Sequence, residues 1–366
     1  MPSFGDGGVE RMLVNLAGGL TRLGMRVDFL TRRRDEAYLD LLDPAVRLVE
    51  TGRSGVFDVQ PFMLRYLREA RPEFILCGKD RAGRAALLAR RISGVPFQLV
   101  MRPGTTVSER VAKRGALKRW RAYRLIRGTY RAAAAVVGNS EGVVADIAAI
   151  AHLPAERLHL IRNPVVTPEL NARAAEPLAH PWFGEGAPPV ILGLGGLRTQ
   201  KGFDVLLAAF ARLRQTRPCR LLILGEGRLR GALEERATAL GVVDDFALPG
   251  FDPNPYRYLA RVGLFVLSSR WEGSPNALTE ALAMGCPVVS TDCPSGPREI
   301  LQGGKVAPLV PVDDVAALAD AMATVLTAPG DPATRRAAVS EYTVETCARR
   351  YFALFEQLRG RGADRR

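Results

Sequence analysis

Short runs of apolar residues alternate along the chain with segments in which apolar residues recur every three or four positions. The runs predict eight buried β-strands, at residues 27–30, 73–77, 97–101, 135–139, 190–195, 220–225, 264–269 and 287–291. The periodic segments predict amphipathic helices, for example at 9–23, 202–216 and 228–240. Strands that are apolar on both faces and alternate with helices are typical of parallel sheets covered by helices on both sides. We therefore predict an α/β protein with two doubly wound domains facing a cleft.

The boundary between the domains is predicted from composition. Residues 162–189 are rich in proline, alanine and polar residues, which is typical of a linker. We place an N-terminal domain at 1–165 and a C-terminal domain at 166–342. The last segment, 343–366, is expected to form a helix that packs back toward the first domain. A chain of 366 residues is long enough for two domains with separate cores.

The first domain begins in an unusual way. The glycine-rich turn GDGG (5–8) is followed directly by the helical pattern of 9–23, which Gly24 ends. A parallel α/β domain normally begins with a strand, so either the first strand is missing from this chain or the sheet is incomplete. We favour a truncated or late-assigned start.

The charge is unevenly distributed. The net charge is +13, and residues 1–165 hold 28 Lys and Arg against 16 Asp and Glu, whereas residues 166–366 hold 23 against 22. Residues 102–131 alone carry ten basic residues and one acid, interleaved with Leu117, Trp120 and Tyr123. This segment either lies on an anionic membrane surface or is a solvated face over a packed stripe. No nucleic-acid module is recognisable, so we expect no nucleic-acid partner.

Several classes of protein are not expected. The sequence contains no run of about 18 apolar residues, so we expect no membrane-spanning helix. The first residues lack the pattern of a signal peptide. The five cysteines are scattered and never spaced Cys-x-x-Cys, and the three histidines have no ligand-like spacing. We therefore predict reduced thiols, no metal site and a cytoplasmic location.

Two glutamates flank a predicted turn in RWEGSPNALTE, residues 270–280. Ser274 is expected to cap the following helix, with Pro275 at its first position and Gly285 just beyond its end. A helix N-terminus favours a phosphate, whereas carboxylates such as Glu272 and Glu280 accept hydrogen bonds from sugar hydroxyls. Two glutamates eight positions apart also occur by chance. Their position around a predicted helix N-terminus nevertheless favours a nucleotide sugar as the ligand. Its phosphate would lie at the helix N-terminus, and the two glutamates would contact its two sugars, one of which is the ribose.

A second turn of this kind lies in GLGGLRTQKGFDVLLAAFARL, residues 193–213. Gly195 and Gly196 allow a ligand to approach the backbone, and Arg198 and Lys201 are cations that can pair with a diphosphate. The alternative is an ordinary turn with solvated basic residues.

With these motifs the chain resembles the family 4 retaining glycosyltransferases of the GT-B fold. The resemblance covers nearly the whole chain and is most specific between 190 and 302. It is carried by GLRTQKGFDVLLAAF, LPGFDPNPYRYLARVGLFVLSSRWEGSPNALTEALAMGCPVVSTD and CPSGPREIL, and in the first half by GDGGVERMLVNLAGGL, GNSEGVVADI and IRNPV.

The resemblance implies that the second domain holds most of a nucleotide-sugar donor. Glu272 would contact the donor sugar, Glu280 the ribose and Lys201 the diphosphate. Further donor contacts are implied for the first-domain residue Gly8, for the turn near the base, Gly250 and Phe251, and for the amides of Gly273, Ser274, Asn276 and Ala277. The chain departs from the family at Gly196, where an arginine is usual, and at Arg102, where many members have a histidine. We hypothesise that Arg198 reaches the diphosphate instead, and that Arg102 serves the acceptor or donor or is simply exposed.

The resemblance also implies the reaction. The acceptor hydroxyl would attack the anomeric carbon from the leaving-group face, with retention, and the diphosphate would take its proton without a metal or other cofactor. The expected reaction moves a hexose or N-acetylhexosamine from a nucleotide sugar, by default a UDP-sugar, to a glycan or lipid-linked acceptor in polysaccharide or lipopolysaccharide synthesis. The alternatives are a nucleotide-sugar 2-epimerase of the same fold and an inactive sugar-nucleotide-binding protein. We expect the enzyme in the cytoplasm, peripheral on the inner membrane through 110–131.

Overall fold

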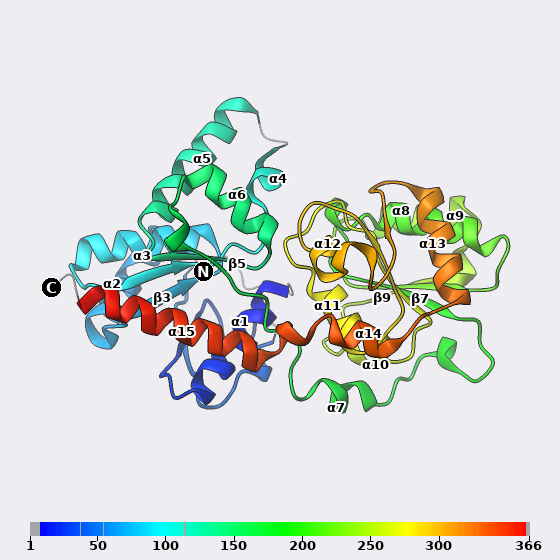
Figure 1. Ribbon diagram of the computed structural model, residues 1–366, viewed down its shortest axis with the longest axis horizontal. Coiled ribbons are helices and arrows are strands. Elements are labelled where there is room, and N and C mark those ends of the chain that lie inside the picture. The colour runs from blue at the N-terminus through cyan, green and yellow to red at the C-terminus, as the bar shows by residue number, and fades with distance from the viewer. Residues whose placement is uncertain (1–7, 37, 54, 113–114, 364–366) are drawn as a thin grey trace. The chain divides into compact units, whose positions relative to one another are not determined.

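The chain folds into two compact units. The computed structural model describes residues 8–36, 38–53, 55–112 and 115–363 (Figure 1). The first unit comprises residues 1–164 and 344–366, and the second comprises 165–343. The polypeptide therefore passes from one unit to the other twice, near residues 164 and 343. The glycine-rich turn at 5–7 lies outside the described residues.

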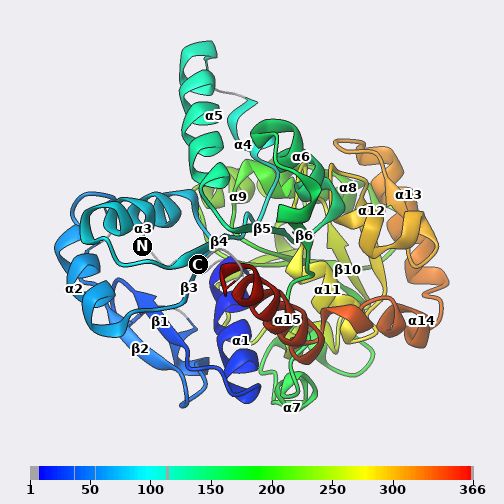
Figure 2. The same ribbon diagram turned by 60° about the vertical axis from the view of Figure 1, so that its left-hand side comes forward.

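Every strand of the first unit pairs with its neighbours in parallel. The strands are β1 (Asp28–Thr31), β2 (Arg47–Glu50), β3 (Phe74–Cys77), β4 (Gln98–Met101), β5 (Ala135–Gly138) and β6 (Leu158–Leu160). The helices are α1 (Gly8–Arg22), α2 (Gln60–Ala70), α3 (Asp80–Ser93), α4 (Val107–Ala112), α5 (Ala116–Arg131), α6 (Glu141–Ala151) and α15 (Val344–Ala363). The last helix, α15, lies beside α1 (Figures 1 and 2).

Helices cover both faces of the first unit's strands. On β4, Leu99 and Met101 belong to a core cluster built with α2, α3, α5 and α6, whereas Val100 belongs to a second cluster built with α1 and α15. Alternate residues of a strand point to opposite faces, so a continuous apolar run is needed to fill both clusters. This is why these strands read as unbroken apolar runs in the sequence.

The second unit contains a single six-stranded parallel sheet. Its strands are β7 (Val190–Leu194), β8 (Arg220–Leu224), β9 (Phe246–Gly250), β10 (Leu264–Leu267), β11 (Val288–Thr291) and β12 (Leu309–Val310), in the order β12-β11-β10-β7-β8-β9. Its helices are α7 (Leu170–Ala175), α8 (Phe203–Arg214), α9 (Arg230–Ala239), α10 (Tyr256–Leu259), α11 (Asn276–Ala283), α12 (Pro297–Ile300), α13 (Val315–Thr327) and α14 (Pro332–Ala337). Numbered within the unit, the strand order is 3-2-1-4-5-6, that of a doubly wound dinucleotide-binding sheet. The doubly wound α/β prediction is thus confirmed.

All eight strands predicted from apolar runs are present, within one or two residues at their ends. Four strands were missed: β2, β6, β9 and β12. In β2 and β6 no residue is fully buried, so neither has the apolar run by which a buried strand is recognised.

The linker prediction for 162–189 is wrong. From Val165 onward this segment belongs to the second unit. Leu170 and Ala174 of α7 are buried in that unit's core, and the Arg173 guanidinium stacks over the ring of Tyr256. A proline- and alanine-rich composition is typical of a surface segment, but it does not predict that Leu170 and Ala174 pack into the core.

In the first unit the strands form two sheets among the described residues: β1 with β2, and β3 to β6. In chain order the arrangement matches that of the second unit, except that no described strand occupies the position between β1 and β3. The start of the chain, on which the expectation of a missing first strand depends, lies outside the described residues.

No helix among the described residues has the length and apolarity to cross a bilayer.

Candidate active site

The candidate site residues predicted in the second unit lie mostly in loops that follow its parallel strands. The loops after β7, β10 and β11 contain residues 195–202, 268–275 and 292–296, and backbone hydrogen bonds join them. Arg270 N–H donates to the carbonyl of Gln200 at 2.7 Å, and Gly296 N–H donates to the carbonyl of Gly273 at 2.9 Å. Ligands of open α/β sheets bind at the carboxyl ends of the strands, so the candidate site has the location that this rule expects.

At the centre of the site Lys201 and Glu272 form an ion pair. The Lys201 ammonium Nζ lies 2.6 Å from Glu272 Oε1, and the Ser269 hydroxyl donates to the same oxygen at 2.7 Å. The Glu272 side chain is 8% exposed and that of Lys201 is 20% exposed. Both donors use Oε1, and no hydrogen bond to Oε2 is made within the described part of the chain. A bound hydroxyl can therefore donate to Oε2 while Oε1 stays held.

Two glycines allow close contacts on either side of Lys201, one with the lysine side chain and one with the loop after β10. Gly195 has φ +143°, and a Cβ there would lie 2.9 Å from Lys201 Cε. Gly202 has φ +62°, and a Cβ there would lie 2.1 Å from the carbonyl oxygen of Ser268. Both positions lie in the region of φ that favours glycine. The glycine turn predicted from the sequence therefore brings the lysine stem against the backbone.

Arg198 lies over Gly196. The Arg198 side chain is exposed, and a Cβ added at Gly196 would lie 3.2 Å from Arg198 Nε. An arginine two residues further along thus places its guanidinium beside the position where an arginine was expected. No described residue pairs with this guanidinium, which leaves its donors available to an anion.

A network around Arg270 fixes the two loops to each other. Arg270 donates through both Nη atoms to Asp204, at 3.0 and 2.8 Å, and through Nε to Asp313 at 2.7 Å. Burial alone would raise the pKa of Asp204, but the hydrogen bonds and charge of Arg270 lower it below the ordinary value. Gln200 completes the network by donating to the carbonyl of Trp271 at 2.9 Å. The sequence did not single out these residues, since their partners are up to 71 positions away.

The helix after the Glu272 loop begins later than expected. Helix α11 starts at Asn276 with Pro275 as its N-cap, and no side chain caps its first N–H groups. The predicted Ser274 cap is therefore wrong: Ser274 lies one residue ahead of the N-cap, where its hydroxyl makes no capping bond. Gly285, with φ +73°, follows the end of the helix as predicted. Glu280 lies in the second turn and is 1% exposed.

The remaining second-unit positions lie at neighbouring strand ends. Gly250 ends β9 with φ +98°, and its carbonyl accepts a hydrogen bond from Gly225 N–H at 2.8 Å. Phe251 follows and is 41% exposed. An exposed aromatic ring beside a strand end is suited to stacking on a planar ligand.

In the first unit, Gly8 is the first residue of α1 and is exposed, whereas Arg102 is 1% exposed. Arg102 donates to the side-chain oxygen of Asn163, and burial lowers the pKa of its guanidinium against the opposing influence of Tyr351. The expectation that Arg102 is simply exposed is thus wrong. A glycine at 104 makes room for it, because a Cβ there would lie 3.0 Å from an Nη atom.

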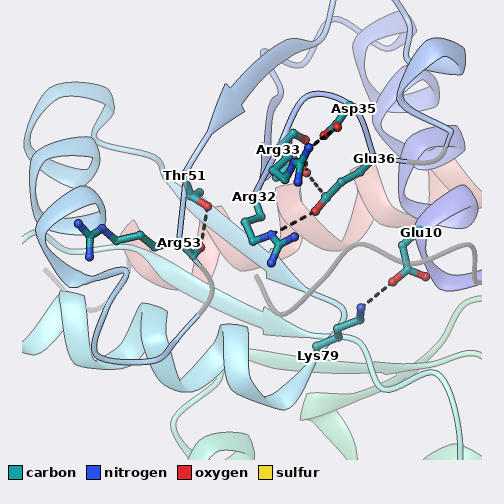
Figure 3. A network of polar contacts seen from close by, with 9 residues as sticks. Glu10, Arg32, Arg33, Asp35, Glu36, Thr51, Arg53 and Lys79 are labelled. Atoms are coloured by element: carbon teal, nitrogen blue, oxygen red, sulfur yellow. Dashed lines mark hydrogen bonds and ion pairs between the residues drawn. The ribbon is translucent and has the colours of Figure 1, made fainter.

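A second polar network, not predicted from the sequence, lies at the carboxyl ends of β1, β2 and β3 (Figure 3). Lys79 Nζ lies 2.5 Å from the buried carboxylate of Glu10 in the first turn of α1. Arg33 donates to Asp35 at 2.8 Å, and Thr51 donates to the carbonyl of Arg53 at 2.9 Å. Lys79, two residues after the strand predicted at 73–77, was the available signal for this cluster.

Within the described residues no group of three His, Cys, Asp or Glu side chains is placed to hold a metal ion. All five cysteines are buried and unlinked. Near the site, burial raises the pKa of the Cys293 thiol to about 12, and the charge of Glu272 adds to this effect. The thiol is therefore protonated at neutral pH.

Two family sequence models match the chain, one in each unit. The model described as "Glycosyl transferase 4-like domain" matches residues 7–164, and that described as "Glycosyl transferases group 1" matches residues 188–328. The second match contains both Lys201 and Glu272. The chain belongs to the family 4 glycosyltransferases.

This glycosyltransferase is similar to bacterial and archaeal glycosyltransferases. It is 28% identical to the N-acetylgalactosamine-N,N'-diacetylbacillosaminyl-diphospho-undecaprenol 4-alpha-N-acetylgalactosaminyltransferase of Campylobacter jejuni, over 88% of each chain. It is 42% identical to an uncharacterized glycosyltransferase of Methanocaldococcus jannaschii, but over only 31% of this chain and 28% of that protein.

Solved structures agree with the fold. HepE of Anabaena, in complex with UDP and glucose, superposes with a TM-score of 0.77 at 19% identity, over 98% of each chain. At this identity the likeness establishes the fold, which is GT-B.

Proposed function

We propose that this glycosyltransferase is a retaining enzyme that transfers a hexose or N-acetylhexosamine from a UDP-sugar to a glycan or lipid-linked saccharide. The observation that carries the proposal is the Lys201–Glu272 pair, with 2.6 Å between Nζ and Oε1. It brings a cation suited to a diphosphate next to a carboxylate suited to sugar hydroxyls. Two likenesses support the choice of substrates: HepE binds UDP and glucose, and the Campylobacter relative is named for a diphospho-undecaprenol acceptor.

In the proposed reaction the bond between the anomeric carbon and the diphosphate oxygen breaks as the acceptor oxygen bonds to the same face of that carbon. The acceptor proton passes to the departing diphosphate, and UDP leaves. Lys201 and Arg198 would stabilise the charge that develops on the diphosphate. Glu272 would hold the donor sugar through Oε2, and Glu280 the ribose. We propose no metal or other cofactor.

Arg198 takes the diphosphate role that the usual arginine at position 196 plays in the family. Its guanidinium lies beside Gly196 and has no partner within the described residues. Arg198→Ala is expected to lower kcat by about 10- to 100-fold, as expected for loss of a charge-assisted hydrogen bond of roughly 1.5–3 kcal/mol. Arg212→Ala, at an exposed position of α8, is the matched control and should leave kcat unchanged.

The test of function begins with thermal-shift measurements of the purified chain with UDP, GDP and ADP and their common sugar conjugates. We expect UDP to raise the melting midpoint and one UDP-sugar to raise it further. That sugar is then supplied with saccharide acceptors, and the anomeric configuration of the product is determined by NMR. An inverted product would overturn the retaining mechanism. Conversion of the UDP-sugar to its 2-epimer without acceptor would favour an epimerase, and binding without any turnover would indicate an inactive nucleotide-binding protein.

We also propose that the enzyme is peripheral on the cytoplasmic face of an anionic membrane, which it contacts through α5. This helix carries six basic residues and no acid. Its inner face is buried through Ile126 and Tyr130, whereas Leu117, Trp120 and Leu125 are more than half exposed. Lipid-facing apolar side chains interleaved with arginines are typical of a helix that lies in a membrane interface.

Co-sedimentation with vesicles tests this proposal. The chain should sediment with vesicles of phosphatidylcholine and phosphatidylglycerol but not with phosphatidylcholine alone, and salt should weaken binding. Arg121→Glu combined with Trp120→Ser should abolish sedimentation. Arg212→Glu makes the same charge change on α8 and should not. Equal binding by both variants would contradict a role for α5.

A further inference from the structure

The first unit has a wide groove at the amino ends of β3, β4 and β5. This edge of the sheet is opposite to the one at which parallel sheets bind their ligands. The groove has a volume of about 1330 Å³ and is lined by the residues that directly precede these strands and by the C-terminal ends of α3, α5 and α15. Six arginines line it: Arg71, Arg90, Arg131, Arg157, Arg359 and Arg361. We call it the arginine groove.

The arginine groove contains little negative charge. Glu73 is the one acid among the described residues that line it, and its carboxylate lies 2.7 Å from Arg359 Nε. The hydrogen bonds from Arg359 lower the pKa of Glu73, so this carboxylate stays ionised and balances that arginine. Within the described part of the chain no acid forms an ion pair with four of the other arginines, which are Arg71, Arg90, Arg131 and Arg361.

Backbone carbonyls hold three of these four arginines in place. Arg90 donates to the carbonyl of Phe97 at 3.2 Å, and Arg131 donates to that of Ala151 at 2.9 Å. Arg361 donates to a further carbonyl at 3.3 Å. Cations are favourable at the C-terminal ends of helices, which explains why the guanidinium groups can gather there. A neutral carbonyl does not cancel their charge, however, and each bond uses one of the five N–H donors of a guanidinium.

The second unit shows that this edge of the fold can carry its own acid. Arg214 ends α8 and Arg220 begins β8, and both lie beside Asp245, which directly precedes β9. Their Nε atoms are 2.7 and 3.7 Å from the two oxygens of Asp245. The arginines at the amino edge of the second sheet are therefore balanced internally. Those of the arginine groove have no equivalent of Asp245 among the described residues that line it, so an anion from outside can supply the balance.

The size and lining of the arginine groove favour a chain segment over a small anion or a flat surface. Its volume of about 1330 Å³ exceeds the roughly 300–1,000 Å³ that is usual for small-molecule sites. Apolar side chains lie among the arginines, including Pro72, Val95 and Pro96, and all three are partly or fully exposed. A bilayer surface is planar, whereas this surface is hollowed. Clusters of arginine are a recurring means of recognising acidic peptide motifs.

We propose that the arginine groove is a docking site for an acidic segment of a partner protein. The carboxylates of the segment pair with the guanidinium groups, and its apolar side chains lie on Pro72, Val95 and Pro96. A cleft lined by charge of one sign attracts the opposite sign, which favours association with such a segment. A partner docked there leaves the carboxyl ends of the same strands accessible. This inference does not depend on the proposed donor, the proposed acceptor or the membrane contact of α5.

The test measures binding of a short fluorescein-labelled peptide in which glutamate alternates with leucine. A matched peptide has glutamine in place of glutamate. Fluorescence anisotropy with the full chain should give a Kd at least about tenfold lower for the acidic peptide. Hydrogen–deuterium exchange should slow at 93–98 and 131–134 when this peptide is bound.

Two pairs of substitutions locate the binding. Arg71→Glu combined with Arg361→Glu should raise the Kd of the acidic peptide at least about tenfold. Arg212→Glu combined with Arg236→Glu makes the same change in net charge at exposed positions of α8 and α9 and should leave the Kd nearly unchanged. If the first pair lowers the melting midpoint, the glutamine variants at the same four positions replace both pairs, since they remove charge without adding acids.

Three results would overturn the proposal. The first is equal affinity for the two peptides. The second is equal weakening by the two pairs of substitutions, which would show that binding follows the net charge of the chain. The third is unchanged peptide binding by Arg71→Glu with Arg361→Glu together with lost binding to vesicles of phosphatidylcholine and phosphatidylglycerol, which would assign the groove to lipid. None of these measurements uses catalysis, so failure of this proposal is distinguishable from failure of the proposed function.

Discussion

Lys201 and Ser269 hold one oxygen of Glu272 from two directions, at 2.6 and 2.7 Å, and leave the other oxygen to a ligand. The three side chains come from the ends of two adjacent parallel strands, β7 and β10, which pair at Leu264 with Ile191. The carboxylate is therefore oriented before any substrate arrives. Such prior orientation is a principal source of rate in sites where charge develops during reaction.

Ser269 is expected to act as a positioning residue. Ser269→Ala removes one of the two donors to Glu272, so the carboxylate gains freedom to rotate. We expect kcat to fall by about 10-fold, corresponding to roughly 1–1.5 kcal/mol, with KM for the donor changed less than kcat. Ser269→Thr keeps the hydroxyl and should restore most of the activity in steady-state kinetics. Equal losses in the Ala and Thr variants would indicate a packing role instead.

Glu272 and Glu280 are expected to have different roles: Glu272 in the transfer step and Glu280 in binding the nucleotide. Glu280→Ala should weaken UDP binding by about 10- to 100-fold, because a carboxylate hydrogen bond contributes roughly 1.5–3 kcal/mol. Glu272→Ala should leave UDP affinity nearly unchanged and mainly slow transfer. Calorimetric titration with UDP, combined with single-turnover transfer rates, distinguishes them. An unchanged transfer rate in Glu272→Ala would remove this residue from the mechanism.

Among these substitutions, replacing Lys201 should lower kcat the most. Lys201→Ala removes the cation proposed for the leaving diphosphate and leaves a buried carboxylate with one donor fewer. We expect kcat to fall by about 10²- to 10³-fold, as for other charge-stabilising donors. Far-UV circular dichroism and the melting midpoint control for unfolding. A kcat within a few-fold of the parent would contradict the assignment.

Two glycines with nearly the same φ provide a test of the backbone contact at Gly202. Gly202 and Gly241 have φ +62° and +68°, but a Cβ meets the Ser268 carbonyl at 2.1 Å only in the first case. Gly241→Ala should cost about 1–2 kcal/mol of unfolding free energy from strain. Gly202→Ala should cost more, because the loops after β7 and β10 must separate. Urea unfolding measures both, and equal losses would show that the clash is relieved cheaply.

The Arg270–Asp204 contact is expected to make the free energy of unfolding depend on pH. The pKa of Asp204 is lower in the folded than in the unfolded chain, so its contribution is present above the unfolded pKa of about 4 and is lost as pH falls through the folded pKa. Asp204→Asn should lower the melting midpoint at pH 7. The difference from the parent should shrink as pH is lowered below 4, and a difference independent of pH would exclude this origin.

Much of the fold and of the candidate site can be predicted from short stretches of the sequence. The eight apolar runs that became strands, the helix after each glycine turn, the positions of Lys201 and Glu272 in loops that follow strands, and that of Glu280 in the next helix could all be predicted. Burial on both faces of a parallel sheet requires unbroken apolar runs, and a turn at a strand end requires glycine, so both leave marks in a few consecutive residues. The predicted Ser274 cap and the linker at 162–189 were wrong because each depended on a contact that composition does not encode.

Only the tertiary structure shows which residues far apart in the chain contact one another. The pairing of Lys201 with Glu272, 71 positions away, arises because β7 and β10 are neighbours in a sheet whose order differs from the chain order. The burial of Arg102 against Asn163 likewise joins residues 61 positions apart, whereas the return of α15 to the first unit agrees with the helix expected at 343–366.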